Sequence, residues 1–157
     1  MSEQAQELIH IEYAQPWKYR WSTGKYIGKT YAETKANKRM VGNQCPECQE
    51  IIWPPEPVCP RCKIYTGENW VDVGDTGTVL QYTYQVMPMW DPHLGKAWAH
   101  PYPSANIRMD SGCHILHRLE EQDSEKLKTV KRVKAVWKEE GRQGGMDDIL
   151  YFRAIDD

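Results

Sequence analysis

From residue 70 onward, apolar and polar positions alternate in short runs that turn residues separate. Within residues 132–138, for example, Val133, Ala135 and Trp137 fall on one face of the run and basic residues fall on the other. Alternation of this kind, in runs rich in β-branched and aromatic side chains, predicts half-buried β-strands. We expect five strands, at residues 78–86, 105–109, 113–119, 132–138 and 149–155. Five short strands with uneven loops are typical of a small Greek-key barrel of the OB-fold type.

The N-terminal part of the chain follows a different pattern. Residues 1–24 contain four Tyr and Trp residues without a clear period, so we expect an extended arm whose rings lie on another surface. From about residue 27 to residue 40 the spacing of apolar and charged positions predicts a short helix, and Gly42-Asn43 ends that pattern. The stretch 120–130, between the third and fourth predicted strands, is charged and is expected to be irregular.

Two Cys-x-x-Cys pairs lie between these regions, Cys45-Pro46-Glu47-Cys48 and Cys59-Pro60-Arg61-Cys62. Zinc binds four thiolates as a tetrahedron, and a two-residue spacer lets one tight turn direct both sulfurs at one ion. We therefore predict a structural Zn²⁺ site formed by Cys45, Cys48, Cys59 and Cys62, closed to substrate because thiolates fill all four positions. Disulfide pairing is the alternative, and it would leave Cys113 unpaired.

Many zinc knuckles carry a glycine directly after the second cysteine, where a positive φ is easily adopted. Gln49 and Lys63 occupy these positions here, so we expect less regular knuckles that keep all their ligands. Residues 51–53 predict a short strand that the following prolines end. The chain is thus predicted to be mainly β, with three parts: an N-terminal arm and short helix (1–44), a rubredoxin-like zinc ribbon (45–69) and a five-stranded OB-fold barrel (70–157).

One long loop joins the first two predicted barrel strands. Residues 87–103 contain two Trp, two Met and four Pro, which argues against simple disorder. Loops longer than about 12–15 residues are commonly functional. We expect a binding loop for a partner or a ligand, and a lid folded over the chain's own barrel is the alternative.

Composition narrows the classes of function. The net charge of −2 gives no overall attraction to nucleic acid or to an anionic membrane, and no apolar run approaches the ~20 residues of a membrane helix. The acidic, polar N-terminus is unlike a signal peptide, and reduced thiols suit the cytoplasm, where we expect the protein. Seven Trp and nine Tyr against one Phe favour a partner surface, because Trp and Tyr prefer half-buried and interface positions.

The sequence shows no complete catalytic constellation. Cys113 and His114 are neighbours on one predicted strand, so their side chains point to opposite faces. The histidines lack the spacing of a metal site, and neither a phosphate-binding glycine loop nor a nucleophile elbow occurs. We therefore predict binding or scaffolding rather than catalysis.

The succession of these motifs resembles the acyl-CoA-associated zinc-ribbon/OB-fold proteins, the small accessory subunits of thiolase-like enzymes. The likeness covers most of residues 19–155 and is carried by Tyr19 to Gly24, the run from Cys45 to Cys62 with its Trp53-Pro54-Pro55, Trp70, Gly77-Thr78-Val79, Tyr82-Thr83, residues 132–137 and residues 148–152. It implies a non-catalytic chain that docks, through its N-terminal segment and ribbon, on a thiolase-like subunit carrying the reactive Cys and His. The implied assembly holds two copies of each chain, and relatives act in steroid side-chain and aromatic degradation.

The resemblance also implies that the chain helps to bind or enclose a coenzyme A thioester. In the long loop, Trp90, Trp98, His100 and Tyr102 are expected to cover the acyl or pantetheine chain, while Arg132 and Lys134 are expected to meet phosphates. For these two cations a solvated strand face is the alternative. Three other functions stay open: a single-stranded nucleic-acid module, which the acidic net charge argues against, a subunit of an acyl-CoA hydratase or aldolase complex, and a self-sufficient CoA enzyme.

Overall fold

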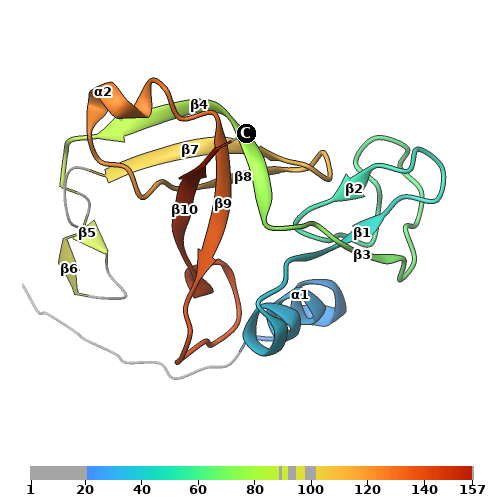
Figure 1. Ribbon diagram of the computed structural model, residues 1–157. Coiled ribbons are helices and arrows are strands. Elements are labelled where there is room, and N and C mark those ends of the chain that lie inside the picture. Colours follow the sequence, from blue (N-terminus) through green and yellow to red (C-terminus); the bar gives the residue numbers. More distant parts are fainter. Residues whose placement is uncertain (1–20, 89, 92–94, 98–101, 157) are drawn as a thin grey trace, which may run out of the picture.

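The computed structural model describes residues 21–88, 90–91, 95–97 and 102–156, so residues 1–20 of the expected arm lie outside the described part. The described chain contains a three-stranded sheet, a five-stranded sheet and a short two-stranded hairpin. Figure 1 shows helix α1 (Gly24–Asn37) at the bottom of the view, beneath the three-stranded sheet and beside the connection that joins the last two strands. The chain is mainly β, as predicted.

Helix α1 confirms the predicted helix, but its bounds differ from residues 27–40. It begins at Gly24 and ends at Asn37, because Lys38 adopts a left-handed conformation (φ 52°) that stops the helix. Its inner face carries two buried threonines, whose hydroxyl groups are satisfied by backbone partners. The hydroxyl of Thr30 donates to the carbonyl of Val41 at 2.6 Å, which ties the helix to the strand that follows it.

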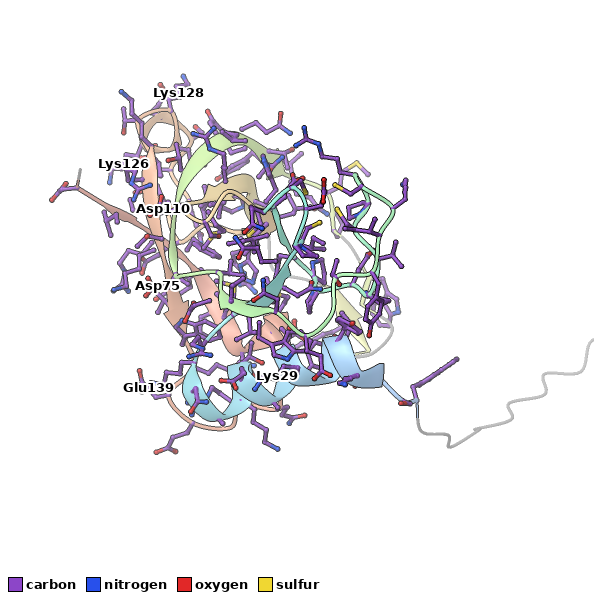
Figure 2. All side chains as sticks on the ribbon, turned by 90° about the vertical axis from the view of Figure 1, so that its right-hand side faces the viewer. Lys29, Asp75, Asp110, Lys126, Lys128 and Glu139 are labelled. Carbon is purple, nitrogen blue, oxygen red and sulfur yellow. The ribbon has the colours of Figure 1, made fainter. Side chains whose placement is uncertain are left out.

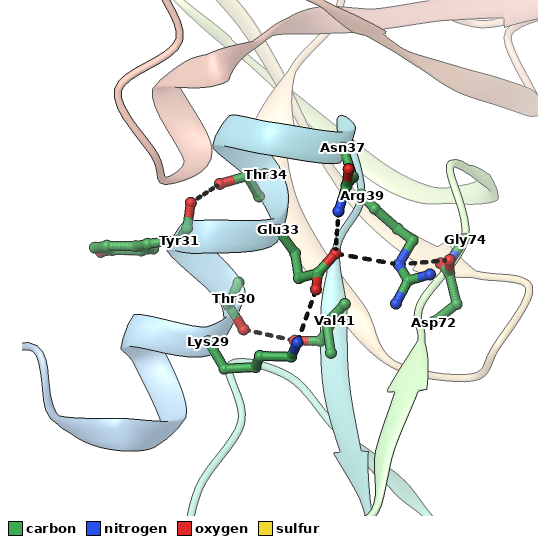
Figure 3. Close-up of polar contacts among 10 residues, drawn as sticks. All are labelled: Lys29, Thr30, Tyr31, Glu33, Thr34, Asn37, Arg39, Val41, Asp72 and Gly74. Atoms are coloured by element: carbon green, nitrogen blue, oxygen red, sulfur yellow. Dashed lines mark hydrogen bonds and ion pairs between the residues drawn. The ribbon is translucent and has the colours of Figure 1, made fainter.

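A polar network also joins α1 to the three-stranded sheet (Figure 3). The carboxylate of Glu33 accepts from Lys29 at 2.7 Å and from Asn37 at 2.8 Å. Arg39 lies between this carboxylate, at 3.8 Å, and that of Asp72, at 3.3 Å. The hydrogen bond from Lys29, followed by that from Asn37, lowers the pKa of Glu33, so this carboxylate stays charged as an anchor for the helix.

The three-stranded sheet has the order β2-β1-β3 and is antiparallel, with β1 at Val41–Gln44, β2 at Ile51–Ile52 and β3 at Trp70–Asp72. Strand β2 confirms the strand expected at residues 51–53. Strand β1 corrects the interpretation of Gly42-Asn43 as a helix stop. A Cβ atom on Gly42 would lie 2.7 Å from the carbonyl oxygen of Ile52, so the glycine permits close strand pairing.

The five predicted barrel strands are all present: β4 (Thr76–Gln85), β7 (Tyr102–Met109), β8 (His114–Arg118), β9 (Arg132–Trp137) and β10 (Ile149–Ile155). They pair antiparallel in the order β10-β9-β4-β7-β8. The two edges approach each other through a parallel bridge between Leu119 and Phe152. The backbone N–H of Glu120 donates to the carbonyl of Phe152 at 2.9 Å, which closes the sheet into a barrel.

The barrel core is continuous with the core of the three-stranded sheet. Phe152 and Ile107 are fully buried at its centre, and Met40 and Val73, which flank β1 and β3, belong to the same cluster. Val133 is fully buried, as its position in the alternating pattern predicts. Burial of one shared apolar cluster therefore holds the two sheets together.

Four short elements complete the described chain. Within residues 120–130, expected to be irregular, the helix α2 (Ser124–Leu127) forms because Asp123 accepts from the N–H groups of Glu125 and Lys126 and because Leu127 is buried. Strands β5 (Trp90–Asp91) and β6 (Lys96–Ala97) form a hairpin within the long loop. The 3₁₀ turn η1 (Met146–Asp148) precedes β10. No helix among the described residues has the length and apolar character needed to cross a bilayer.

Candidate metal centre and binding surfaces

The four cysteines of the two Cys-x-x-Cys pairs converge on one point. Their sulfur atoms all lie within 4.8 Å of one another, with Cys45 and Cys59 buried and Cys48 and Cys62 half-buried. The Sγ atoms of Cys48 and Cys59 are 3.8 Å apart. A tetrahedron with metal–sulfur bonds of about 2.3 Å has sulfur–sulfur edges of about 3.8 Å, so this cluster has the size of a Zn²⁺ site. All five cysteines are free thiols, and the disulfide alternative is wrong.

The two knuckles have the same backbone geometry. In the first, the N–H of Gln49 donates to the carbonyl of Cys45 at 3.0 Å; in the second, the N–H of Lys63 donates to that of Cys59 at 2.9 Å. Gln49 and Lys63 both adopt a left-handed conformation, with φ of 60° and 61°. The expectation of less regular knuckles is therefore wrong: these two residues adopt the conformation that glycine usually supplies.

The surroundings shift the pKa values of the thiols in opposite directions. The backbone N–H of Cys62, 3.4 Å from the Sγ of Cys59, is the main cause that lowers the pKa of Cys59 to about 7. The neighbouring sulfur of Cys48 is the main cause that raises the pKa of Cys62 to about 12. Four crowded thiols thus resist ionising together, and a divalent cation would compensate the charge of four thiolates.

A buried amide braces the ribbon between the knuckles. The side-chain Nδ2 of Asn43 donates to the carbonyl of Glu56 at 2.8 Å and to the hydroxyl of Thr66 at 2.6 Å, and its Oδ1 accepts from the N–H of Glu56 at 3.2 Å. Asn43 is fully buried. The role of Asn43 is not evident from the sequence, because an Asn after a Gly is also a common signal for a helix end or a turn.

Apolar side chains are exposed beside the second knuckle. Val58, Ile64 and Tyr65 are 45 %, 37 % and 65 % exposed, and Val58 pairs with Tyr65 across an antiparallel bridge. We call these three residues the knuckle patch. Because the backbone of the knuckle is held by the metal centre, the patch lies on a rigid surface rather than on a free loop.

A second group of exposed apolar residues follows β4. Val86, Met87 and Trp90 are 70 %, 70 % and 65 % exposed, and we call them the loop patch. Of the other predicted coenzyme A contacts, Trp98 and His100 lie outside the described residues. Tyr102 is the first residue of β7, and its side chain is also outside the described part.

The two cations expected to meet phosphates are engaged with carboxylates. Arg132 forms a bidentate pair with Asp110, at 2.6 and 2.9 Å, and Lys134 lies 3.4 Å from Asp75. The hydrogen bonds from Arg132, followed by that from Thr76, lower the pKa of Asp110 to about 2. Figure 1 places the β5–β6 hairpin away from the start of β9, so the predicted aromatic and basic contacts come from separate parts of the fold. The contact of Arg132 and Trp90 with coenzyme A stays a prediction.

No nucleophile with an adjacent base occurs among the described side chains. Cys113 is buried, and burial raises the pKa of its thiol. The His117 ring packs edge-on against Phe152, with 5.5 Å between ring centroids, and burial lowers its pKa. This arrangement is that of a histidine packed into the barrel.

Comparisons with known proteins agree with this architecture. The family described as "ChsH2, rubredoxin-like zinc ribbon domain" matches residues 36–64, and "ChsH2, C-terminal OB-fold domain" matches residues 70–138. A DUF35 domain-containing scaffold protein of Methanocaldococcus jannaschii is 24 % identical over 84 % of this chain and 93 % of its own length. One of Pyrococcus furiosus is 24 % identical over 70 % of this chain and 76 % of its own length.

A third relative, a probable enoyl-CoA hydratase alpha subunit of Thermomonospora curvata, is 29 % identical over 55 % of this chain but only 25 % of its own length. A chain of the solved structure "Ltp2-ChsH2(DUF35) aldolase" shares the fold with a TM-score of 0.60 and 24 % identity, covering 86 % of this chain and 98 % of that chain. A DUF35 protein of unknown function from Sulfolobus solfataricus has a TM-score of 0.51 and 18 % identity. The match covers 82 % of this chain and 85 % of that chain. With both domains matched in order over more than half of its length, the chain belongs to the ChsH2-type family of zinc-ribbon and OB-fold proteins.

Proposed function

We propose that this chain is a non-catalytic accessory subunit that docks on a thiolase-type enzyme and helps to enclose its acyl-CoA thioester. The observation that carries the proposal is the knuckle patch, in which three apolar side chains are exposed beside the metal centre. Exposed apolar groups on a rigid, zinc-braced surface favour a protein contact, because their removal from water stabilises association without ordering a loop.

The loop patch supports the second part of the proposal. Val86, Met87 and Trp90 are largely exposed at the end of β4 and the start of the hairpin. Such side chains are suited to cover an acyl or pantetheine chain once the catalytic subunit is in place. Closure of a shared site by this loop would also exclude water from a reacting thioester.

An aldolase or hydratase partner is the second candidate. The solved relative described as an aldolase and the relative described as a probable enoyl-CoA hydratase subunit favour it. In both candidates this chain contributes docking and enclosure, and the partner contributes the reacting groups. The two differ only in the identity of the catalytic chain.

The direct test is to purify the tagged full-length chain from its native cell and to identify stoichiometric partners by mass spectrometry. We expect a thiolase-like chain. A hydratase-like or aldolase-like chain in its place would support the second candidate and overturn the first. A chain that purifies alone, as a stable monomer that never binds such an enzyme, would overturn both.

A pair of variants locates the docking surface. Ile64→Glu combined with Tyr65→Glu places charge in the knuckle patch, and we expect it to abolish recovery of the partner. Leu116→Glu is the matched control, because Leu116 is 73 % exposed and belongs to the barrel strand β8 rather than to the zinc ribbon. Loss of the partner in Leu116→Glu alone would assign docking to the barrel and would contradict docking through the knuckle patch.

A further inference from the structure

A groove of about 850 Å³ lies at one end of the barrel, lined by residues 128–132 and 154–156. Its walls are the segment between α2 and β9 and the end of β10. Figure 1 shows these segments meeting near the C-terminus, and Figure 2 shows Lys126 and Lys128 extending outward at the end opposite α1. The volume is that of a small-molecule site, in the usual range of about 300–1,000 Å³.

The groove is basic in a chain of net negative charge. Among the described residues its lining includes the cations Lys128, Lys131 and Arg132 and one carboxylate, that of Asp156. Over residues 126–134 the sequence contains five basic residues and no acidic one. A local excess of positive charge in a concave surface favours an anionic ligand.

The carboxylates that pair with these cations do not occupy all of the positive charge in the groove, so part of it can bind a ligand. The bidentate pair with Asp110 fixes Arg132 at the rim. Lys128 pairs at 2.7 Å with Glu125, but both side chains are well exposed, and such pairs exchange at small cost in free energy. For the exposed Lys131, no carboxylate within ion-pair distance is found in the described part of the chain.

Apolar side chains form the remainder of the lining. Val130, Ala154 and Ile155 lie beside the cations, and Ile155 is partly exposed. A simple anion would use only the charged groups, whereas a ligand with a planar ring and phosphates would cover both kinds of surface. The concave shape and the nucleotide-sized volume also favour a small ligand over an acidic protein surface.

We propose that this groove binds the phosphoryl groups of a nucleotide-type ligand, with Lys128 and Lys131 contacting the phosphates and the ring lying over Val130 and Ile155. The ligand chemistry is shared by a free nucleoside diphosphate and by the nucleotide end of coenzyme A. With coenzyme A as the ligand, the inference rests on the proposed function and deepens it by naming the groove for the nucleotide end; with a free nucleotide, it goes beyond that function. Binding is measured on this chain without a partner, so the inference can fail while partner recovery succeeds, and the reverse.

The test is isothermal titration of the zinc-loaded full chain with ADP, adenosine, inorganic pyrophosphate and coenzyme A. We expect ADP to bind more tightly than pyrophosphate, and adenosine to bind weakly. Tighter binding of coenzyme A than of ADP would assign the site to the coenzyme tail, and the reverse order would assign it to a free nucleotide; both support the proposal. Pyrophosphate binding as tightly as ADP would overturn the role of the apolar lining and the proposal with it.

Matched variants separate this site from general charge effects. We expect Lys128→Gln combined with Lys131→Gln to weaken ADP binding at least tenfold. Lys25→Gln combined with Lys35→Gln removes the same charge from α1, and we expect less than a twofold change. Unchanged binding in the groove variant, equal loss in the α1 variant, or binding of polyglutamate without binding of ADP would each overturn the proposal.

Discussion

The backbone N–H of Gly145 donates a 2.9 Å hydrogen bond to the hydroxyl of Thr34, which lies 111 residues earlier in the chain. Thr34 is fully buried on α1, and Gly145 lies in the connection between β9 and β10. Beside it, the carboxylate of Asp148 accepts from the N–H groups of Gln143 and Gly144 at 3.0 and 2.7 Å. These hydrogen bonds satisfy backbone N–H groups that folding removes from water. Because one of the acceptors is on α1, the bonds also fix the helix to the barrel.

Thr34→Val should therefore destabilise the junction between helix and barrel. The change keeps the shape of the side chain and leaves the N–H of Gly145 without its acceptor, which costs about 1–3 kcal/mol of unfolding free energy. Urea titration followed by tryptophan fluorescence measures the loss. Thr34→Ser, which keeps the hydroxyl group, should retain more of the stability. Equal stability of Thr34→Val and the parent chain would show that the bond contributes nothing.

Cys59→Ser should convert the chain from one bound zinc ion to none and unfold the ribbon around residues 41–72. Cys59 is a fully buried member of the thiol cluster, and a module with so small a core depends on its metal for folding. Metal analysis and NMR spectra report the two effects separately. Cys113→Ser is the control: it alters the barrel core, and we expect it to keep the ion. Stoichiometric zinc in Cys59→Ser would contradict the assignment.

Lys63→Gly should stabilise the second knuckle. Lys63 has a φ of 61°, a conformation that costs a side-chain-bearing residue free energy and costs glycine little, so we expect a gain of up to about 1 kcal/mol. Gln49→Gly should gain less, because it also removes the 2.8 Å bond from the Gln49 amide to the carbonyl of Pro46. Lys35→Gly, in the last turn of α1, should instead lose up to about 1 kcal/mol. Thermal unfolding of the zinc-loaded variants measures all three.

The ion pair of Asp110 with Arg132 should make the barrel sensitive to acid. The pKa of Asp110 is lowered from 3.8 to about 2, chiefly by Arg132. Because the folded-state pKa lies below the unfolded-state pKa, the contribution is present above pH 3.8 and is lost as the pH falls through 2. We expect Asp110→Asn, and equally Arg132→Gln, to flatten the dependence of the unfolding free energy on pH between these values. A slope equal to that of the parent chain would contradict the prediction.

Local signals predicted the elements of this fold well. The spacing of the cysteines identified the metal cluster, and the alternation around Val133 identified a strand whose inner face is buried. Helix bounds were less accurate, because Lys38 ends α1 through a left-handed conformation that its residue type does not signal. Likewise Gln49 and Lys63 adopt a glycine-like conformation because two hydrogen bonds in each knuckle require it.

The sequence by itself determined the four thiol ligands, the order of helix, ribbon and barrel strands, and the presence of amphipathic aromatic residues, because each depends on residues close together in the chain. The tertiary structure alone decided the bond between Thr34 and Gly145, the pairing of Arg132 with Asp110, and the groove at Lys128 and Lys131. These features join segments far apart in sequence. Their geometry follows from how the closed barrel packs on the helix. Residues close together in the sequence therefore cannot predict it.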